Sequence, residues 1–96
     1  MITHIVIFRT KCDADKALLL DQVKSLKSIE SATDFACGAP IISDRPVVDD
    51  TFAVGLVVSF KSADDMSAYM IHPTHLKFNE FLAQYKIKVQ VFDIAS

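Results

Sequence analysis

Hydrophobic and polar positions follow two different periods along this chain, which predicts a mixture of strands and helices. Short runs of β-branched and aromatic residues bounded by Gly, Pro or Asp are typical of strands. Longer segments with apolar residues three and four positions apart are typical of amphipathic helices. The predicted order is strand 3–9, helix 13–29, strand 33–38, strand 52–60, a helix from Ser62 that Pro73 interrupts, a further helical segment from Pro73 to about residue 85, and strand 87–94.

Two of these strands are apolar on both faces, so both faces are expected to be covered. Side chains alternate along a strand. The first strand then places His4, Val6 and Phe8 on one face and Ile5, Ile7 and Arg9 on the other. The strand over 52–60 places Phe52, Val54, Leu56, Val58 and Phe60 together, opposite Ala53, Gly55, Val57 and Ser59. The small residues of that second face indicate close packing or room for a ligand.

The order βαββαβ predicts an α+β ferredoxin-like domain over residues 1–96, with a four-stranded antiparallel sheet and helices on one face. The opposite face of the sheet would then be apolar and bare, which is an aggregation liability for a monomer. Packing two such sheets face to face about a twofold axis covers both of them. We therefore expect a homodimer joined through its sheet faces, which is a dimeric α/β barrel.

Local signals predict how the helices begin and how one long connection is used. Asp13 or Asp15 can cap the first helix, and Ser62 can cap the second. Residues 39–50 form a long connection between two strands, so we expect this loop to make a short arm or to cover a sheet edge.

Composition excludes several classes of protein and partner. The chain has 96 residues, of which 51% are hydrophobic and 23% charged, which suits one domain with a core and an apolar surface for a partner. A net charge of -2 and scattered cations, with Lys24 and Lys27 the closest grouping, argue against nucleic acid as a partner.

Cys12 and Cys37 fit no metal motif and are expected to be idle thiols, although a disulfide between them is an alternative that the sequence leaves open. No signal peptide or membrane-spanning run is found, so we expect a cytoplasmic protein without a membrane partner.

The segment from Tyr69 to His75 holds the candidate chemistry, because it brings a phenol and two imidazoles to a helix junction fixed by Pro73. His75 falls in the first turn of the new helix, whose positive end disfavours a protonated ring. A neutral imidazole can act as a general base. Tyr69 can donate a hydrogen bond to a developing oxyanion, and His4 on the first strand can line the same cavity.

Structural roles are the alternative for each of these residues. A histidine beside a proline often caps a helix, which is the favoured interpretation for His72. Tyr69, His75 and His4 could equally be core residues with satisfied polar atoms. A metal site of His4, His72 and His75 lacks a carboxylate or cysteine ligand, and Pro73 disrupts the helix that such a site needs, so neither a metal nor a cofactor is expected.

Residues 3–9 (THIVIFR), the segment Tyr69-x-x-His72-Pro73-x-His75-x-x-Phe78 and the closing Val91-Phe92-Asp93 together resemble the stress-responsive A/B barrel (Dabb, dimeric α/β barrel) family. The resemblance covers nearly the whole chain and implies a ferredoxin-like protomer in a homodimeric barrel. The family includes stress-induced proteins without an assigned reaction and a plant cyclase that closes a polyketide chain by an aldol condensation. In that cyclase, residues matching Tyr69 and His75 carry the acid/base work and one matching His4 lines the pocket. The cyclase has a further histidine where this chain has Val54.

Three functions remain open at this point. The first is a homodimer in a stress response that binds a small apolar or phenolic molecule between helices and sheet. The second is a cofactor-free lyase or cyclase with His75 as base, Tyr69 as hydrogen-bond donor and His4 in the same site. The third is a structural oligomer without a ligand.

Overall fold

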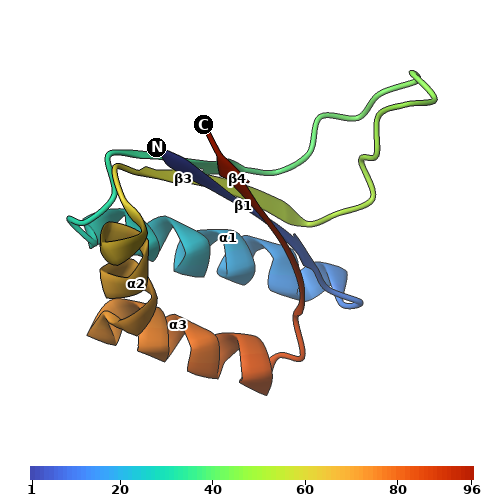
Figure 1. The fold of residues 1–96 in the computed structure, drawn as a ribbon. Coiled ribbons are helices and arrows are strands. Elements are labelled where there is room, and N and C mark those ends of the chain that lie inside the picture. The colour runs from blue at the N-terminus through green and yellow to red at the C-terminus, as the bar shows by residue number, and fades with distance from the viewer.

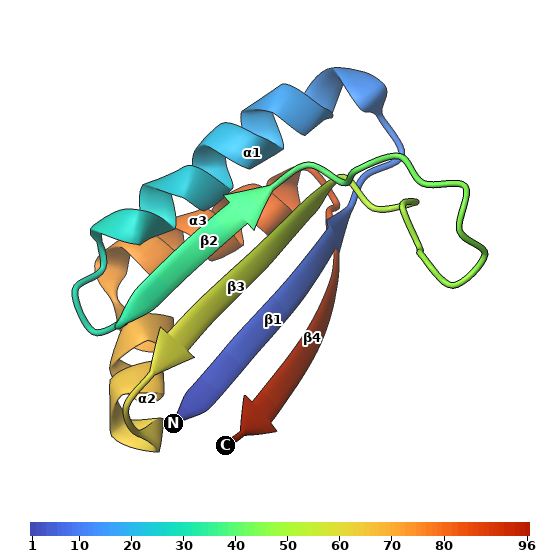
Figure 2. The same ribbon diagram turned by 90° about the horizontal axis from the view of Figure 1, so that it is seen from above.

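Four strands form one antiparallel sheet, and every helix lies on the same face of it (Figure 1, Figure 2). The computed structural model describes residues 1–96. The sheet order is β2-β3-β1-β4, as the predicted ferredoxin-like α+β fold requires. The elements are β1 (Ile2–Arg9), the 3₁₀ turn η1 (Asp13–Asp15), α1 (Lys16–Ser25), the 3₁₀ turn η2 (Leu26–Ser28), β2 (Asp34–Gly38), β3 (Val54–Phe60), α2 (Ala63–Ile71), α3 (Pro73–Gln84) and β4 (Lys88–Ala95).

The hydrophobic core lies between the helices and the sheet. Antiparallel pairing sets His4 opposite Val58 and Val6 opposite Leu56, so each strand contributes alternate residues to this side. The predicted grouping of His4, Val6 and Phe8 on one face of β1 is confirmed, and this face meets the helices, since all three residues are buried. The helices complete the core with Leu19, Val23, Tyr69, Phe78 and Phe81.

The small-residue face of β3 points away from this core, on the side of the sheet without helices. Gly55 and Val57 lie there, and the Val57 side chain is 42% exposed. Any room that these small residues leave therefore lies on the helix-free side of the sheet and not between helices and sheet. The prediction that Phe52 joins the Val54 face is wrong, because β3 begins only at Val54 and the alternation does not reach Phe52. A Cβ at Gly55 would lie 3.4 Å from the Phe52 ring, so that ring covers Gly55 instead.

The helix-free side of the sheet, which we call the open face, carries a row of paired apolar residues. Ile5 pairs with Val57 on one side and with Phe92 on the other, and Val57 pairs in turn with Ala36. Phe92 is 49% exposed although it is a large apolar residue. No element of the chain covers this face (Figure 1).

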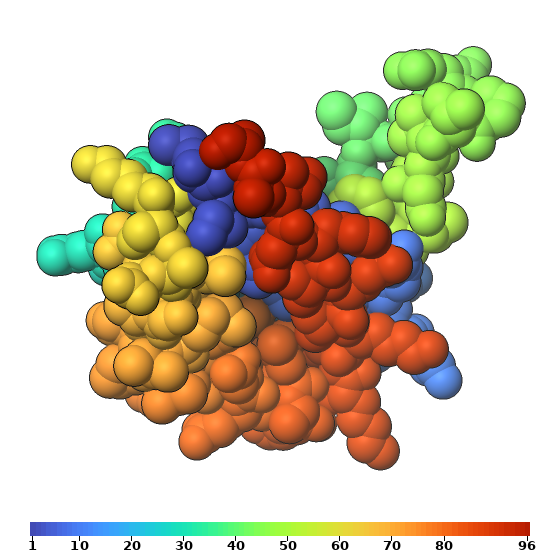
Figure 3. All heavy atoms as spheres, viewed as in Figure 1, coloured from blue at the N-terminus to red at the C-terminus, as the bar shows by residue number.

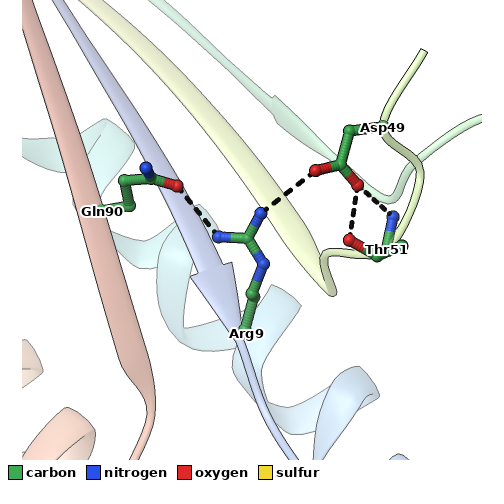
Figure 4. A network of polar contacts seen from close by, with 4 residues as sticks. All are labelled: Arg9, Asp49, Thr51 and Gln90. Atoms are coloured by element: carbon green, nitrogen blue, oxygen red, sulfur yellow. Dashed lines mark hydrogen bonds and ion pairs between the residues drawn. The ribbon is translucent and has the colours of Figure 1, made fainter. Parts of the chain in front are cut away.

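The long connection before β3 forms an arm over residues 39–53. Of the two predicted alternatives, a short arm or a cover for a sheet edge, the structure shows the arm. The arm stands out from the rest of the molecule on the open-face side (Figure 3), and its Ile41, Ile42 and Val47 are almost fully exposed. Figure 4 shows how its base is held.

Arg9 ties the arm to two strands of the sheet. Its Nη1 donates to Gln90 Oε1 at 3.0 Å, and its Nη2 lies 3.5 Å from Asp49 Oδ2. The backbone N–H of Thr51 donates to Asp49 Oδ1 at 2.9 Å, and the Thr51 hydroxyl donates to the same oxygen. These hydrogen bonds from Thr51 hold the pKa of Asp49 below its ordinary value. The arm therefore leaves the sheet in a defined direction.

The predicted N-cap is confirmed for the second helix, α2, and is wrong for the first helix, α1. Ser62 caps α2, since its Oγ accepts a hydrogen bond from the Asp65 N–H at 3.2 Å. Neither Asp13 nor Asp15 caps the first helix: Asp15 already has helical dihedral angles, and Asp13 pairs with Lys16 Nζ at 3.1 Å. None of the helices combines the length and apolar character needed to cross a bilayer.

Candidate functional site

Three predicted site residues, His4, Tyr69 and His75, lie side by side in the core. Tyr69 belongs to the end of α2 and His75 to the first turn of α3, and their ring centroids are 4.9 Å apart in an edge-to-face arrangement. The His4 ring on β1 lies 6.3 Å from the Tyr69 ring in the same type of contact. Tyr69 is 0% exposed and His75 6% exposed. The bend at Pro73 thus serves to bring both helices to one point over β1.

Two polar atoms of this cluster have no hydrogen-bond partner in the protein. They are the Tyr69 hydroxyl and His75 Nδ1, both of which are fully buried. A buried polar group without a partner costs about 1–3 kcal/mol of stability, and such groups are rare in native proteins. The arrangement is therefore unfavourable as packing alone, and it offers one donor and one ring nitrogen to a ligand.

Burial decides the protonation states of both groups. It raises the pKa of Tyr69, and the proximity of Cys37 adds to this effect, so the phenol keeps its proton at neutral pH. Burial also lowers the pKa of His75, and nearby His4 lowers it further, so the imidazole is neutral. The predicted direction for His75 is confirmed, but the main cause is burial and not the end of the helix.

Asp93 on β4 is a fourth polar residue of the site, and no local pattern of the sequence predicts its role. Its Oδ1 lies 2.5 Å from His4 Nδ1, because β1–β4 pairing sets the two residues directly opposite each other. A carboxylate can only accept, so Nδ1 carries the proton of this bond and Nε2 is the ring nitrogen left for another partner. Strand alternation alone puts Asp93 on the same face as Val91, but the partner across the strand depends on the register.

A cavity of about 90 Å³ adjoins His75 on the side of the sheet edge. Its walls are almost entirely apolar. The helices contribute Met70, Phe78 and Leu82, and the sheet contributes Val6, Phe8 and Leu56 from its central strands and Val89 from the edge strand β4. Met70 and Val89 are both exposed, so the cavity lies just below the surface. Tyr69 does not line this cavity, although its ring packs edge-to-face on that of His75, which does.

His72 has the structural role that the sequence favoured. Its Nδ1 accepts a hydrogen bond from the Thr74 N–H at 3.1 Å and so caps α3, with Pro73 in the first helical turn. This use of the ring separates His72 from His4 and His75, and no group of three metal-binding side chains forms. Cys12 and Cys37 are free thiols, so the disulfide that the sequence left open is not formed.

The neutral state of buried His75 predicts a loss of stability in mild acid. The unfolded chain binds a proton at the ordinary histidine pKa of about 6.5, whereas the folded state binds it only at lower pH. The free energy of unfolding should therefore be highest above pH 6.5 and fall as the pH drops from there through the lowered pKa of His75. Urea denaturation at pH 7.5 and pH 5.5 measures this difference. His75→Phe, which keeps a buried ring without a titrating group, should reduce it, and an unchanged difference in this variant would contradict the assignment.

Comparisons with known proteins agree with the observed fold. A model of the family described as the stress responsive A/B barrel domain matches residues 2–96. A dimeric ferredoxin-like protein of unknown function from Jannaschia sp. CCS1 superposes with a TM-score of 0.80 at 18% identity, over 99% of this chain and 98% of its own.

Two further solved structures have the same fold. A Dabb family protein from Mesorhizobium loti has a TM-score of 0.74 at 24% identity, over 99% of this chain and 95% of its own. A hydroxynitrile lyase from Passiflora edulis has a TM-score of 0.69 at 21% identity, over 99% of this chain and 94% of its own. No significant match was found among curated protein sequences.

Proposed function

The chain belongs to the stress responsive A/B barrel domain family, and from this membership we propose that it forms a homodimeric barrel that binds a small apolar or phenolic molecule beside His75. The proposal has two parts, the dimer and the pocket, and each rests on a different surface of the sheet. The dimer would use the open face, and the pocket lies on the helix side.

The dimer part is supported by the bare apolar row on the open face. Ile5, Val57 and Phe92 lie next to each other in the sheet register, and no helix or loop of the chain covers them. An apolar patch of this kind on a small protein usually marks an interaction surface. A second copy supplies the same patch about a twofold axis, so the two sheets are self-complementary. The Jannaschia protein with the same fold is dimeric.

The pocket part rests on one observation, the unpartnered Tyr69 hydroxyl and His75 Nδ1. Tyr69 does not line the cavity, so a ligand there meets His75 first and must displace part of the wall to reach the phenol. Its oxygen could then accept from Tyr69 and donate to the neutral imidazole, which would remove the cost of leaving both unpaired. The cavity of about 90 Å³ is smaller than the roughly 150 Å³ that holds a benzene molecule in an engineered core. Even a single ring therefore exceeds the cavity as it stands, and Met70 or Leu82 at the cavity wall must shift to admit one.

Phenol and toluene form a matched pair of probes for this pocket, because they have nearly the same shape and differ in one hydroxyl group. We expect phenol to bind about tenfold more tightly than toluene, since one hydrogen bond contributes about 1 kcal/mol or somewhat more. ¹⁵N NMR titration measures both affinities, with shifts expected for amides around Tyr69 and His75. In the Tyr69→Phe variant the preference for phenol should fall to about threefold or less.

The other outcomes of this titration are equally informative. Equal affinity for the two probes in the unaltered protein would show that Tyr69 and His75 do not receive a ligand. An absence of saturable binding by either probe would leave the structural oligomer as the better interpretation of the fold.

A cofactor-free acid/base reaction is the second candidate function, and the protonation states favour it. His75 is neutral and could take a proton from a substrate, while protonated Tyr69 could stabilise the oxyanion that results. His4 would assist through Nε2, with its ring fixed by Asp93. The fold is compatible with such chemistry, since the Passiflora edulis lyase shares it. Any lyase or cyclase activity found for the chain should then be lost in both His75→Gln and Tyr69→Phe.

A further inference from the structure

A second and larger cavity, of about 580 Å³, lies at the end of the sheet where β1 ends and β4 begins. We call it the basic pocket, because it carries four cationic side chains against one carboxylate, that of Asp15. The cations are Arg9, Lys11, Lys86 and Lys88. It shares no lining residue with the cavity beside His75. A chain with a net charge of -2 thus concentrates positive charge at one place.

The cations of the basic pocket are arranged against their own electrostatic preference. Strand pairing sets Arg9 directly opposite Lys88, and like charges opposite each other destabilise a sheet. Arg9 is only partly compensated, by Asp49 at 3.5 Å. Lys11, Lys86 and Lys88 make no ion pair within the chain. An anion placed between them would remove this repulsion.

Backbone strain at Lys86 is a second destabilising feature of the basic pocket. Lys86 is the one residue other than glycine with a positive φ, of 54°, in the turn between α3 and β4. A glycine would adopt this conformation freely, whereas a lysine there is strained. The strained turn nevertheless places a cation in the lining of the basic pocket.

We propose that the basic pocket binds a small organic phosphate. Its volume falls in the range of about 300–1,000 Å³ that is usual for small-molecule sites. Lysine and arginine side chains provide charge for the phosphate group. Tyr85, which packs on Phe81 with ring centroids 4.6 Å apart, provides a fixed aromatic wall for the organic part of the ligand.

Phenyl phosphate is the probe that tests this proposal, with inorganic phosphate as the comparison at constant ionic strength. We expect saturable ¹⁵N NMR shifts at residues 10–12 and 86–88, and at least threefold tighter binding of phenyl phosphate than of inorganic phosphate. The double variant Lys11→Gln/Lys88→Gln should weaken binding at least tenfold. Both lysines are exposed, so the substitutions should not affect folding, which far-UV circular dichroism checks.

The matched control is Lys24→Gln/Lys27→Gln, which removes the same charge where α1 ends and η2 follows, whereas the basic pocket adjoins the start of α1. It should change the affinity less than twofold. If both double variants weaken phenyl phosphate binding equally, the anion responds only to the net charge of the protein, and the proposal is overturned. Non-saturable shifts would overturn it as well. Equal affinity for the two phosphates would overturn the assignment of an organic ligand.

Discussion

Val57→Lys is expected to convert the proposed dimer into monomers, with a dimer dissociation constant at least a thousandfold higher. Val57 lies near the centre of the open face, between Ile5 and Ala36 in the sheet register. Twofold symmetry would bury two lysines in one interface, and a buried charge without a partner costs several kcal/mol. About 4 kcal/mol corresponds to a factor of about a thousand. Sedimentation equilibrium across a range of protein concentrations measures the change.

Leu76→Lys is the matched control for this variant. Leu76 is an apolar residue of α3 that is 50% exposed and lies on the helical side of the molecule, away from the open face. The same change of chemistry there should leave the dissociation constant within about threefold of the original. A dimer that persists in Val57→Lys at micromolar concentration would mean that the copies do not associate through their sheets.

Tyr69→Phe is expected to stabilise the protein, raising the free energy of unfolding by about 1–3 kcal/mol. The substitution removes a buried hydroxyl that has no partner in the protein and keeps the ring that packs on Phe60 and His75. Tyr69→Ala should have the opposite effect and cost about 3–5 kcal/mol, because it also removes the buried ring. Urea denaturation at pH 7.5 measures both values.

The two variants together separate the parts that the Tyr69 ring and hydroxyl play. A stabilised Tyr69→Phe that no longer prefers phenol over toluene would identify the hydroxyl as a functional group kept at a cost in stability. Destabilisation by Tyr69→Phe would instead indicate that the hydroxyl has a hydrogen-bond partner in the folded protein and is not free to bind a ligand, which would contradict the proposed pocket.

The cluster of His4, Tyr69 and His75 was within reach of the sequence because its parts obey local rules. Pro73 fixes a helix start, His72 caps it, and His75 then falls in the first turn by spacing alone. Strand alternation places His4 on the same face as Val6 and Phe8. Each of these inferences uses residues that are neighbours in the chain, for which periodicity and turn chemistry are reliable guides.

The chain alone determined the order of its elements and which residues share a strand face, because both depend on hydrophobic periodicity. Which of the two faces meets the helices was decided by the tertiary structure, since the first and third strands are apolar on both. The register between strands decided the rest. It joins His4 to Asp93 across 89 positions, and it gathers Arg9 and Lys88 into a basic pocket although the cations look scattered in the sequence. The end of the alternation at Val54 likewise sends Phe52 to the open face. Such contacts depend on long-range pairing, and no local period specifies which residues of distant strands will meet.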